Sequence, residues 1–318
     1  MYTPDEAITE LRFAVKELGF KACTFGTEVW RAPPIVEREA PQLAGALKAV
    51  YPVALDARHD YDPVWRECLT LKVAVASHTS ARGNWGRRIS PSNYVFNHLG
   101  DFAEGGDYFC RALFLGGVTR RFPGLSFAFL EGGVGWAAQL YNNIVEHWEK
   151  RNPEVLRANL DPATLDLDLM AALAEKYGGG LVTPEAARAQ PRRNRMGGVV
   201  DVEIDEFKPC RIETIEDIAE LFAEPFYFGC EADDRMNVVA FDPRLHHCGV
   251  KLKAMFGSDI GHWDVMDMNA VLPQAYELVE EGLMSEADFK AFICDNPASF
   301  FTRQNPDFFK GTTVEGKV

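Results

Sequence analysis

The chain has 318 residues, of which 47% are hydrophobic and 25% charged, and its net charge is −14. This composition is typical of a soluble globular protein, and the length suffices for one α/β barrel of ~250 residues with insertions. The acidic balance excludes nucleic acid and anionic membranes as expected partners, because phosphate binding needs a basic face. The longest apolar runs, such as 125–130, are far shorter than the ~18 residues of a membrane span.

The cysteines and the N-terminus indicate the compartment. Seven cysteines are scattered singly with no Cys-x-x-Cys pair, as in cytoplasmic proteins with reduced thiols. The first six residues, Met-Tyr-Thr-Pro-Asp-Glu, contain no basic region followed by an apolar one, so no secretory signal is predicted. We therefore expect a cytoplasmic protein.

In chain order, helices alternate with short apolar strands. Residues 5–18 place apolar side chains on one helical face, and Gly19 ends this helix. A second helix opens at Asp62-Pro63, with proline in its first turn. Further helices are expected at 102–114, 136–150, 167–177, 270–281 and 285–294. The expected strands are 20–25, 72–77, 125–130, 225–229 and 252–256.

Polar residues follow four of these strands at the point where each strand ends. They are His78, Glu131, Glu231 and Asp259. Short apolar strands separated by helices are typical of a parallel sheet buried on both faces, which collects ligands at its carboxyl edge. Doubly wound sheets and barrels share this pattern, so the spacing leaves both open.

Between 151 and 209 the alternation breaks. This stretch is rich in Pro, Gly and charge, with one helix at 167–177. We interpret it as an insertion that acts as a lid or as a contact in a homodimer. Four arginines near its end form either a solvated loop or a clamp for an anionic substrate; they are Arg188, Arg192, Arg193 and Arg195.

His78 and Asp259 are candidate metal ligands. A neutral imidazole at a strand end is a good ligand for Zn²⁺, although a lone histidine is more often structural. Asp259 stands in Gly-Ser-Asp-Ile-Gly-His-Trp-Asp, where its carboxylate can serve as ligand and general base. The alternative is that Asp259 caps the next helix.

Other motifs carry weaker signals. Gly133-x-Gly135-x-x-Ala138 matches a loose dinucleotide fingerprint, but the chain then enters the insertion instead of presenting an acidic residue ~20 positions on. The run His246-His247-Cys248 could suggest a metal site. Adjacent side chains face different ways on a helix or strand, which argues against one shared ion.

Five motifs in order resemble the amidohydrolase-related proteins of the aminocarboxymuconate-semialdehyde decarboxylase type. They are Tyr61–Trp65, Ser77-His78, Arg121–Leu125 leading to Glu131-Gly132-Gly133, Gly257–Asp259 with His262-Trp263-Asp264, and Asp295–Ala298. The resemblance implies one metal-dependent (β/α)8 TIM-barrel domain over 1–318, interrupted by the insertion at about 151–209.

Carried over by motif, His78 and Asp259 are the metal ligands. The resemblance also shows two departures. Glu131 occupies a position where these decarboxylases have a histidine, and no histidine precedes His59, so the family's first-strand pair has no counterpart. About five of eight strands are found, and we expect the barrel to lack its N-terminal part.

The resemblance implies a divalent-metal-dependent hydrolase acting on a small carboxylated or cyclic organic molecule, with Zn the expected ion and Mn or Fe as alternatives. Asp259 would take a proton from activated water, assisted by Glu131. Glu231, His262 and Trp263 would contact substrate. Two alternatives stay open: non-oxidative decarboxylation, with a Glu of raised pKa as the acid, and an inactive fragment or pseudoenzyme.

Overall fold

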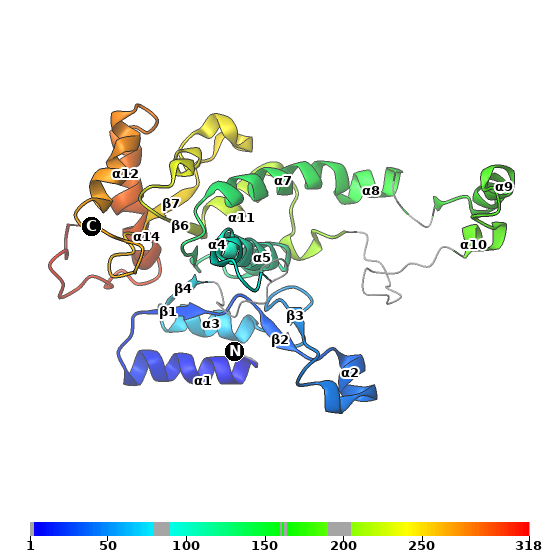
Figure 1. Cartoon of the computed structure of the whole chain (residues 1–318), viewed down its shortest axis with the longest axis horizontal. Helices are drawn as coiled ribbons and strands as arrows, with labels where there is room; N and C mark the ends of the chain where they lie inside the picture. The colour runs from blue at the N-terminus through cyan, green and yellow to red at the C-terminus, as the bar shows by residue number, and fades with distance from the viewer. Residues whose placement is uncertain (1–2, 79–89, 160, 162–163, 190–204, 318) are drawn as a thin grey trace. The chain divides into compact units, whose positions relative to one another are not determined.

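The structure is a computed structural model, which describes residues 3–78, 90–159, 161, 164–189 and 205–317. The chain forms two compact units (Figure 1). The first contains Met1–Val145 and Pro209–Val318, and the second contains Glu146–Lys208. No helix among the described residues is both long enough and apolar enough to cross a membrane.

The first unit is built on a parallel sheet of five strands in the order β1-β4-β5-β6-β7. These are β1 (Ala22–Phe25), β4 (Ala74–Ser77), β5 (Phe127–Phe129), β6 (Phe226–Cys230) and β7 (Lys253–Phe256). All five strands expected from the sequence are thereby confirmed. Within the described residues the sheet does not close, and β1 and β7 are its edges.

One face of the sheet carries large aromatic side chains that pack against helices. Phe127 contacts Trp65 of α3 (Asp62–Thr70), with ring centroids 5.7 Å apart. Phe226 and Phe228 meet Phe222 of α11 (Ile215–Ala223) at 5.2 and 6.1 Å. Helices α5 (Asp101–Leu115) and α7 (Gly135–Arg151) complete this layer. Burying large aromatic rings on this face supplies much of the hydrophobic stabilisation.

The opposite face carries mainly alanines, together with Tyr227 and Met255, and the C-terminal helix α14 (Asn296–Thr302) packs there. We call it the small-residue face. Phe300 lies among Ala74, Ala76 and Ala128, and its ring centroid is 5.3 Å from that of Tyr227. Because successive side chains of a strand point to opposite faces, the sheet has one face for α14 and another for the helical layer.

Gln304 and Arg303, just after α14, close the amino-terminal end of the sheet. The buried Gln304 side chain donates to Val73 O at 2.7 Å and accepts from Ser126 N at 3.0 Å. Arg303 donates to Pro123 O at 2.9 Å. These bonds hold α14 over the small-residue face, with its first turn towards the carboxyl ends of the strands.

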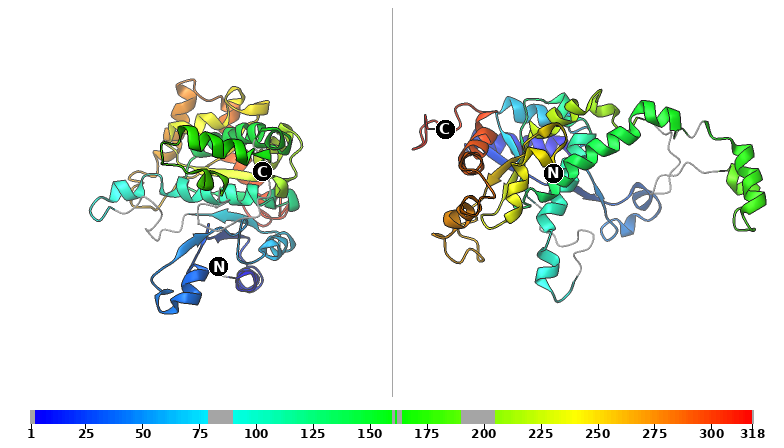
Figure 2. Two further views of the ribbon diagram at one scale, coloured as in Figure 1. Left: turned by 90° about the vertical axis from the view of Figure 1, so that its right-hand side faces the viewer. Right: turned by 90° about the horizontal axis from the view of Figure 1, so that it is seen from above.

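Helix α1 (Pro4–Arg12) packs beside α3 (Figures 1 and 2), and an ion pair of 2.8 Å between Arg12 and Glu67 joins them. The capping box of Thr3 and Glu6 starts α1. The sequence predicted one helix over residues 5–18. In the structure its first part is α1, and a π-helix, Phe13–Glu17, follows directly. The last two expected helices are α12 (Val271–Glu280) and α13 (Glu286–Lys290), the latter followed by a π-helix, Ala291–Asp295.

Several short elements were not expected from the sequence. An antiparallel hairpin pairs β2 (Val29–Arg31) with β3 (Ala49–Tyr51), and α2 (Pro34–Glu39) lies within its connection. The others are α4 (Tyr94–His98), α6 (Val118–Arg121) and 3-10 turns at Pro41–Leu43, Lys208–Cys210, Arg235–Ala240, Pro243–Leu245 and His247–Gly249. The helices α11 and α14 were not expected either.

The second unit contains the end of α7 followed by α8 (Pro153–Asn159), α9 (Leu167–Tyr177) and α10 (Pro184–Arg188). The sequence predicted only the second of these three helices. Arg188 pairs with Asp168 at 2.9 Å. The other arginines of this group, for which a solvated loop or a clamp was considered, are Arg192, Arg193 and Arg195, and they lie outside the described residues.

Candidate active site

Four polar side chains follow four adjacent strands of the sheet. His78 follows β4, Glu131 comes two residues after β5, Glu231 follows β6, and Asp259 comes three residues after β7. Because the strands are parallel and neighbouring, their carboxyl ends bring these residues to one edge.

A cavity of about 490 Å³ lies at this edge and is lined by all four residues. Its floor is the small-residue face, with Ala76, Gly229 and Met255, and α14 contributes the opposite wall. The remaining lining residues are Ala22, Cys23, Thr24, Leu130, Cys230, Phe256, Gly257, Pro297, Phe300 and Phe301. The structure therefore combines a polar rim with a mainly apolar interior.

His78 and Glu131 form the closest pair at the rim. His78 Nε2 lies 2.6 Å from Glu131 Oε2, and Phe102 packs edge-on against the imidazole with centroids 4.9 Å apart. Glu131 has a φ of 64°, a left-handed conformation that is costly for a residue with a side chain. The turn is held by Leu130 N, which donates to Ser77 O, and by Gly133 N, which donates to Gly229 O.

Asp259 is also left-handed, with a φ of 47°. Gly257 N donates to Cys230 O at 2.8 Å, which fixes the start of the loop that carries Asp259. The next helix, α12, has Ala270 as its N-cap. Asp259 therefore does not cap that helix, and the structural alternative considered from the sequence is wrong.

The carboxylates at the rim are close enough to share a cation. One oxygen each of Glu131, Glu231 and Asp259 lies within 4.8 Å of the others. Desolvation, followed by the negative charges of Asp233, Glu131 and Asp259, raises the pKa of Glu231. Among the described residues, no Lys or Arg forms an ion pair with these three carboxylates. This donor set, with His78 beside it, fits a divalent metal ion.

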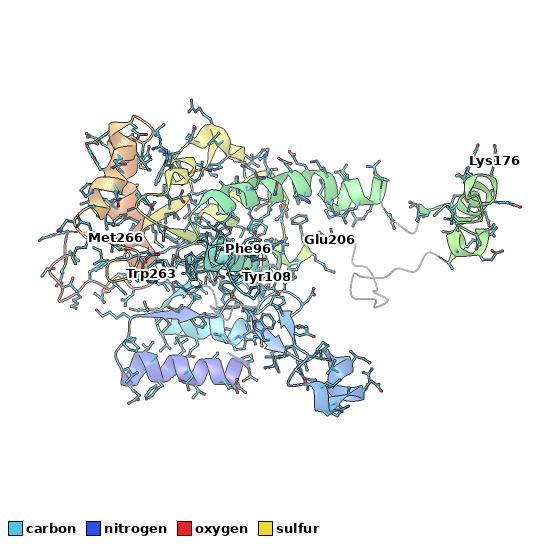
Figure 3. The ribbon with its side chains drawn as sticks, in the orientation of Figure 1. Phe96, Tyr108, Lys176, Glu206, Trp263 and Met266 are labelled. Carbon is cyan, nitrogen blue, oxygen red and sulfur yellow. The ribbon has the colours of Figure 1, made fainter. Side chains whose placement is uncertain are left out.

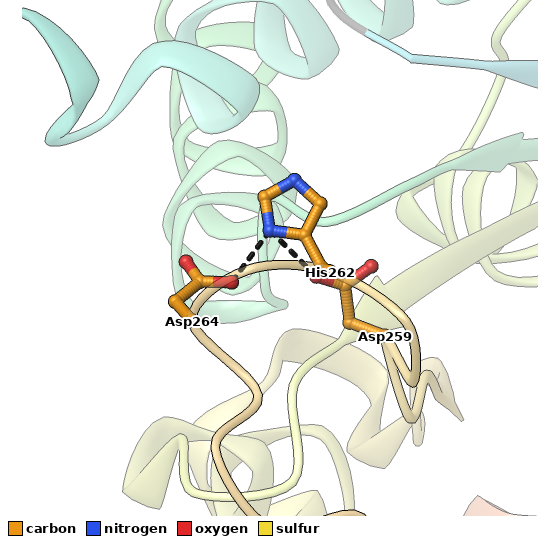
Figure 4. A group of neighbouring side chains, drawn as sticks. All are labelled: Asp259, His262 and Asp264. Atoms are coloured by element: carbon orange, nitrogen blue, oxygen red, sulfur yellow. Dashed lines mark hydrogen bonds and ion pairs between the residues drawn. The ribbon is translucent and has the colours of Figure 1, made fainter.

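His262 and Trp263 lie on the loop after β7 and do not line the cavity. His262 Nδ1 is 2.5 Å from Asp264 Oδ1 and 3.5 Å from Asp259 Oδ2 (Figure 4). The hydrogen bond with Asp264, and then the nearby negative charges, raise the pKa of His262. Trp263, labelled in Figure 3, is 71% exposed and meets Tyr94 with ring centroids 6.0 Å apart. The structure brings together four of the six predicted site residues and leaves these two outside.

The run His246-His247-Cys248 has a different role from metal binding. Two groups of His, Cys, Asp and Glu side chains among the described residues could hold an ion, and neither includes this run. His246 is buried, with Nδ1 3.0 Å from Val250 O, and desolvation lowers its pKa. His247 O accepts from Tyr141 at 2.8 Å. These residues anchor a turn beneath α7.

Sequence reasoning missed the residues that shape the cavity from α14 and from the sheet interior. Pro297, Phe300, Phe301 and Cys230 line it. The Asp-Asn-Pro-Ala motif did mark the start of α14, where Asn296 donates to Ala254 O at 2.8 Å. Nothing in the local sequence indicates that the following phenylalanines reach the site.

Comparisons with known proteins place this geometry in context. A family model described as amidohydrolase matches residues 1–160. An amidohydrolase structure from Mycobacterium avium subsp. paratuberculosis K-10 is similar with a TM-score of 0.51 and 17% identity, covering 94% of this chain and 55% of its own. A 2,6-dihydroxybenzoate decarboxylase from Rhizobium matches with a TM-score of 0.40 and 15% identity, over 94% of this chain and 68% of its own. The chain has no significant match among curated proteins.

The chain thus spans about half the length of the Mycobacterium amidohydrolase. At this low identity the structural likeness establishes the fold, which is of the (β/α) TIM-barrel type, as the sequence predicted. The family match covers half of the chain and includes the rim residues His78 and Glu131. Together with a parallel sheet whose carboxyl edge carries side chains that could hold a metal ion, it identifies the chain as a member of the amidohydrolase family.

Proposed function

We propose that the chain acts as a divalent-metal-dependent hydrolase on a small carboxylated or cyclic organic molecule. The observation that carries this proposal is the convergence of His78, Glu131, Glu231 and Asp259 on one cavity at the carboxyl edge of the sheet. A carboxylate of raised pKa, here Glu231, in a cavity at such an edge is characteristic of catalytic sites.

His78 and Asp259 are the proposed metal ligands, and Glu231, which has an oxygen within 4.8 Å of one of Asp259, is the candidate for a third. Zinc is the expected ion, because imidazole and carboxylate donors both suit it, and manganese and iron are the alternatives. A divalent ion held there would lower the pKa of a bound water toward ~7 and polarise the scissile bond.

The rim residues would then move protons. Asp259 is proposed to accept the proton of the attacking water and pass it to the leaving group. Glu131 is the second proton carrier, since its carboxylate lies 2.6 Å from the His78 imidazole and faces the same cavity. The left-handed turns at Glu131 and Asp259 hold both carboxylates toward the cavity, which reduces the cost of orienting them during the reaction.

The cavity favours a small substrate with an apolar body. A volume of about 490 Å³ lies within the range of ~300–1,000 Å³ seen for small-molecule sites. Leu130, Met255, Phe300 and Phe301 provide apolar wall. Glu231 stands at the rim, where it would meet a polar group of the substrate.

Decarboxylation is the second candidate, and one observation favours it. The pKa of Glu231 is raised by desolvation and by neighbouring carboxylates. A raised pKa extends the pH range in which a carboxyl group carries a proton, and such a group is suited to protonate the carbon left after CO₂ departs.

The test separates these reactions from each other and from an inactive protein. The purified chain would be assayed for zinc, manganese and iron, and then offered a panel of lactones, amides and ring carboxylates in ¹⁸O-labelled water. Hydrolysis transfers ¹⁸O to the product, whereas decarboxylation releases CO₂ without ¹⁸O in the other product. A chain that binds metal stoichiometrically and turns over a ring carboxylate with CO₂ release would contradict the hydrolase proposal. Absence of metal and of turnover would favour an inactive protein.

A further inference from the structure

We propose that the loop after β7 holds a second divalent-cation site, formed by Asp259, His262 and Asp264 (Figure 4). One ligand atom of each residue lies within 4.8 Å of the others. The hydrolase mechanism proposed above does not use His262 or Asp264 in this way. Asp259 belongs to both groups, so its carboxylate would stand between the cavity ion and this outer ion.

The loop backbone gathers all three ligands from six consecutive residues. Asp259 and Gly261 have positive φ values of 47° and 103°, which curl the chain back on itself. His262 N donates to Asp259 O at 3.0 Å, and Val265 N donates to His262 O at 3.3 Å. Because the turn is formed by the loop's own hydrogen bonds, cation binding requires little further ordering of the backbone.

The donor set selects the kind of cation. One imidazole and two carboxylates suit Zn²⁺, Co²⁺ or Mn²⁺, whereas Ca²⁺ and Mg²⁺ prefer oxygen donors alone. Bonds of ~2.0–2.2 Å place neighbouring donors of a zinc ion roughly 3–3.5 Å apart. His262 Nδ1 already lies 3.5 Å from Asp259 Oδ2, and the 2.5 Å contact with Asp264 has to open by only about 1 Å. Three protein ligands leave a position open for water.

The surroundings attract cations and leave the site accessible. The side chains of Asp259, His262 and Asp264 are each about two-fifths exposed. A neighbouring cavity of about 410 Å³ is lined by Glu231, Asp233 and Asp267 as well as by Asp259 and Asp264. This concentration of negative charge raises the local cation concentration, in a chain whose net charge is already −14.

The experiment is a metal titration of the full chain after removal of bound metal by chelation. Zn²⁺ binding is followed by calorimetry in 0.15 M salt with millimolar Mg²⁺, and stoichiometry is checked by elemental analysis. The unmodified chain is expected to bind two equivalents. His262→Ala is expected to bind one, and His78→Ala to retain the outer equivalent. Asp259→Asn is expected to weaken both sites. His247→Ala, a histidine outside both groups, is the matched control, and circular dichroism verifies folding.

The outcomes distinguish this inference from the proposed function. If His262→Ala binds zinc with the same stoichiometry and affinity as the unmodified chain, the outer site does not exist, whatever happens in the cavity. If the chain binds a single ion that His262→Ala removes and His78→Ala retains, the outer site is supported and the cavity ion is contradicted. Co²⁺ absorption adds a second readout, since losing an imidazole ligand would alter the visible spectrum of the outer ion.

Discussion

Glu131 differs from an ordinary surface carboxylate in both its backbone and its partner. It adopts a left-handed φ of 64° and directs its carboxylate to within 2.6 Å of His78 Nε2. Strained backbone that persists in a folded protein is often associated with function. The contact with an imidazole at the cavity rim, instead of with an arginine on the surface, fits a role in proton transfer.

We predict that Glu131→Gln lowers kcat by roughly 10²–10⁴-fold, the usual contribution of a general acid or base. The amide keeps the size of the side chain but cannot carry the proton. Metal content, measured in parallel, should not change. Asp233→Asn, which removes a nearby carboxylate outside this group, serves as the control. Loss of metal from Glu131→Gln would instead make Glu131 a ligand.

Asp217 illustrates a carboxylate that stabilises the fold. Its pKa is lowered by the hydrogen bond from Arg120 at 2.8 Å and by backbone hydrogen bonds from Glu213 and Thr214. It also completes the capping box that starts α11. A lowered folded-state pKa means that this stabilisation is full above the unfolded pKa of about 3.9 and is lost as the pH falls through the folded value.

We therefore predict that Asp217→Ala lowers the free energy of unfolding by about 1–2 kcal/mol at pH 7. The difference from the unmodified chain should shrink as the pH falls below about 3.9, because the protonated Asp217 no longer pairs with Arg120. Urea unfolding of both proteins, at pH 7 and at a pH below about 3.9, measures this difference in the free energy of unfolding. Glu216→Ala, on the same helix and exposed, should change stability by less than about 0.5 kcal/mol. A pH-independent difference would show that the ion pair contributes nothing.

Residue positions at the rim were predictable, but their contacts were not. A polar residue after an apolar strand identifies His78, Glu131, Glu231 and Asp259 as edge residues. The pairing of His78 with Glu131 depends on a left-handed turn that no local pattern indicates, since such conformations are uncommon for glutamate. The substrate contacts of His262 and Trp263 stay a prediction, and the loop turns His262 toward Asp264.

At the level of elements, the strands of the parallel sheet were predictable because each is an apolar run between helices. The hairpin of β2 and β3 was not, since its three-residue strands are too short to show a period and are joined by 17 residues containing α2 (Ala32–Lys48). The packing position of α14 could not be predicted from the sequence either. A short helix with adjacent phenylalanines gives no sign that it will cover the small-residue face of the sheet.

The second unit, Glu146–Lys208, contains the stretch interpreted from sequence as an insertion. Its role as lid or dimer contact stays a prediction. An ion pair of 2.8 Å between Arg151 and Glu206 joins the two ends of this stretch. A short Gly-Ser linker from Arg151 to Glu206 can therefore replace the residues between them.

We predict that this replacement leaves the sheet unit folded and changes either substrate range or oligomeric state. The sheet, its helices and the cavity belong to the first unit, which retains its own core. Circular dichroism and thermal unfolding test the folding, and light scattering tests the mass. A replacement with unchanged mass and unchanged substrate range would show that the segment is neither lid nor interface.

For the whole molecule, the negative charges at the cavity rim also affect the stability of the folded chain. The net charge is −14, and the carboxylates of Glu131, Glu231 and Asp259 gather within 4.8 Å of one another. Desolvation is the main cause of the raised pKa of Glu231, and repulsion from the neighbouring carboxylates adds to it. A bound cation would convert this repulsion into attraction, so the folded chain should gain more from divalent ions than the unfolded chain, in which these residues are far apart.

We predict that zinc or manganese raises the Tm of the sheet unit. An ion that binds only the folded state at about a hundred times its Kd contributes ~2.7 kcal/mol. For a unit of this size that corresponds to a shift of roughly 5–10 °C. Calorimetry of the chelator-treated chain, with and without the ion, measures the shift. Asp259→Asn should abolish most of it, because Asp259 belongs to both groups of candidate ligands. Asp267→Asn, in the same loop but outside both groups, should retain it. An equal shift in all three proteins would mean that the ion acts elsewhere, through general screening of the acidic surface, and the metal site at the carboxyl edge of the sheet would have to be abandoned.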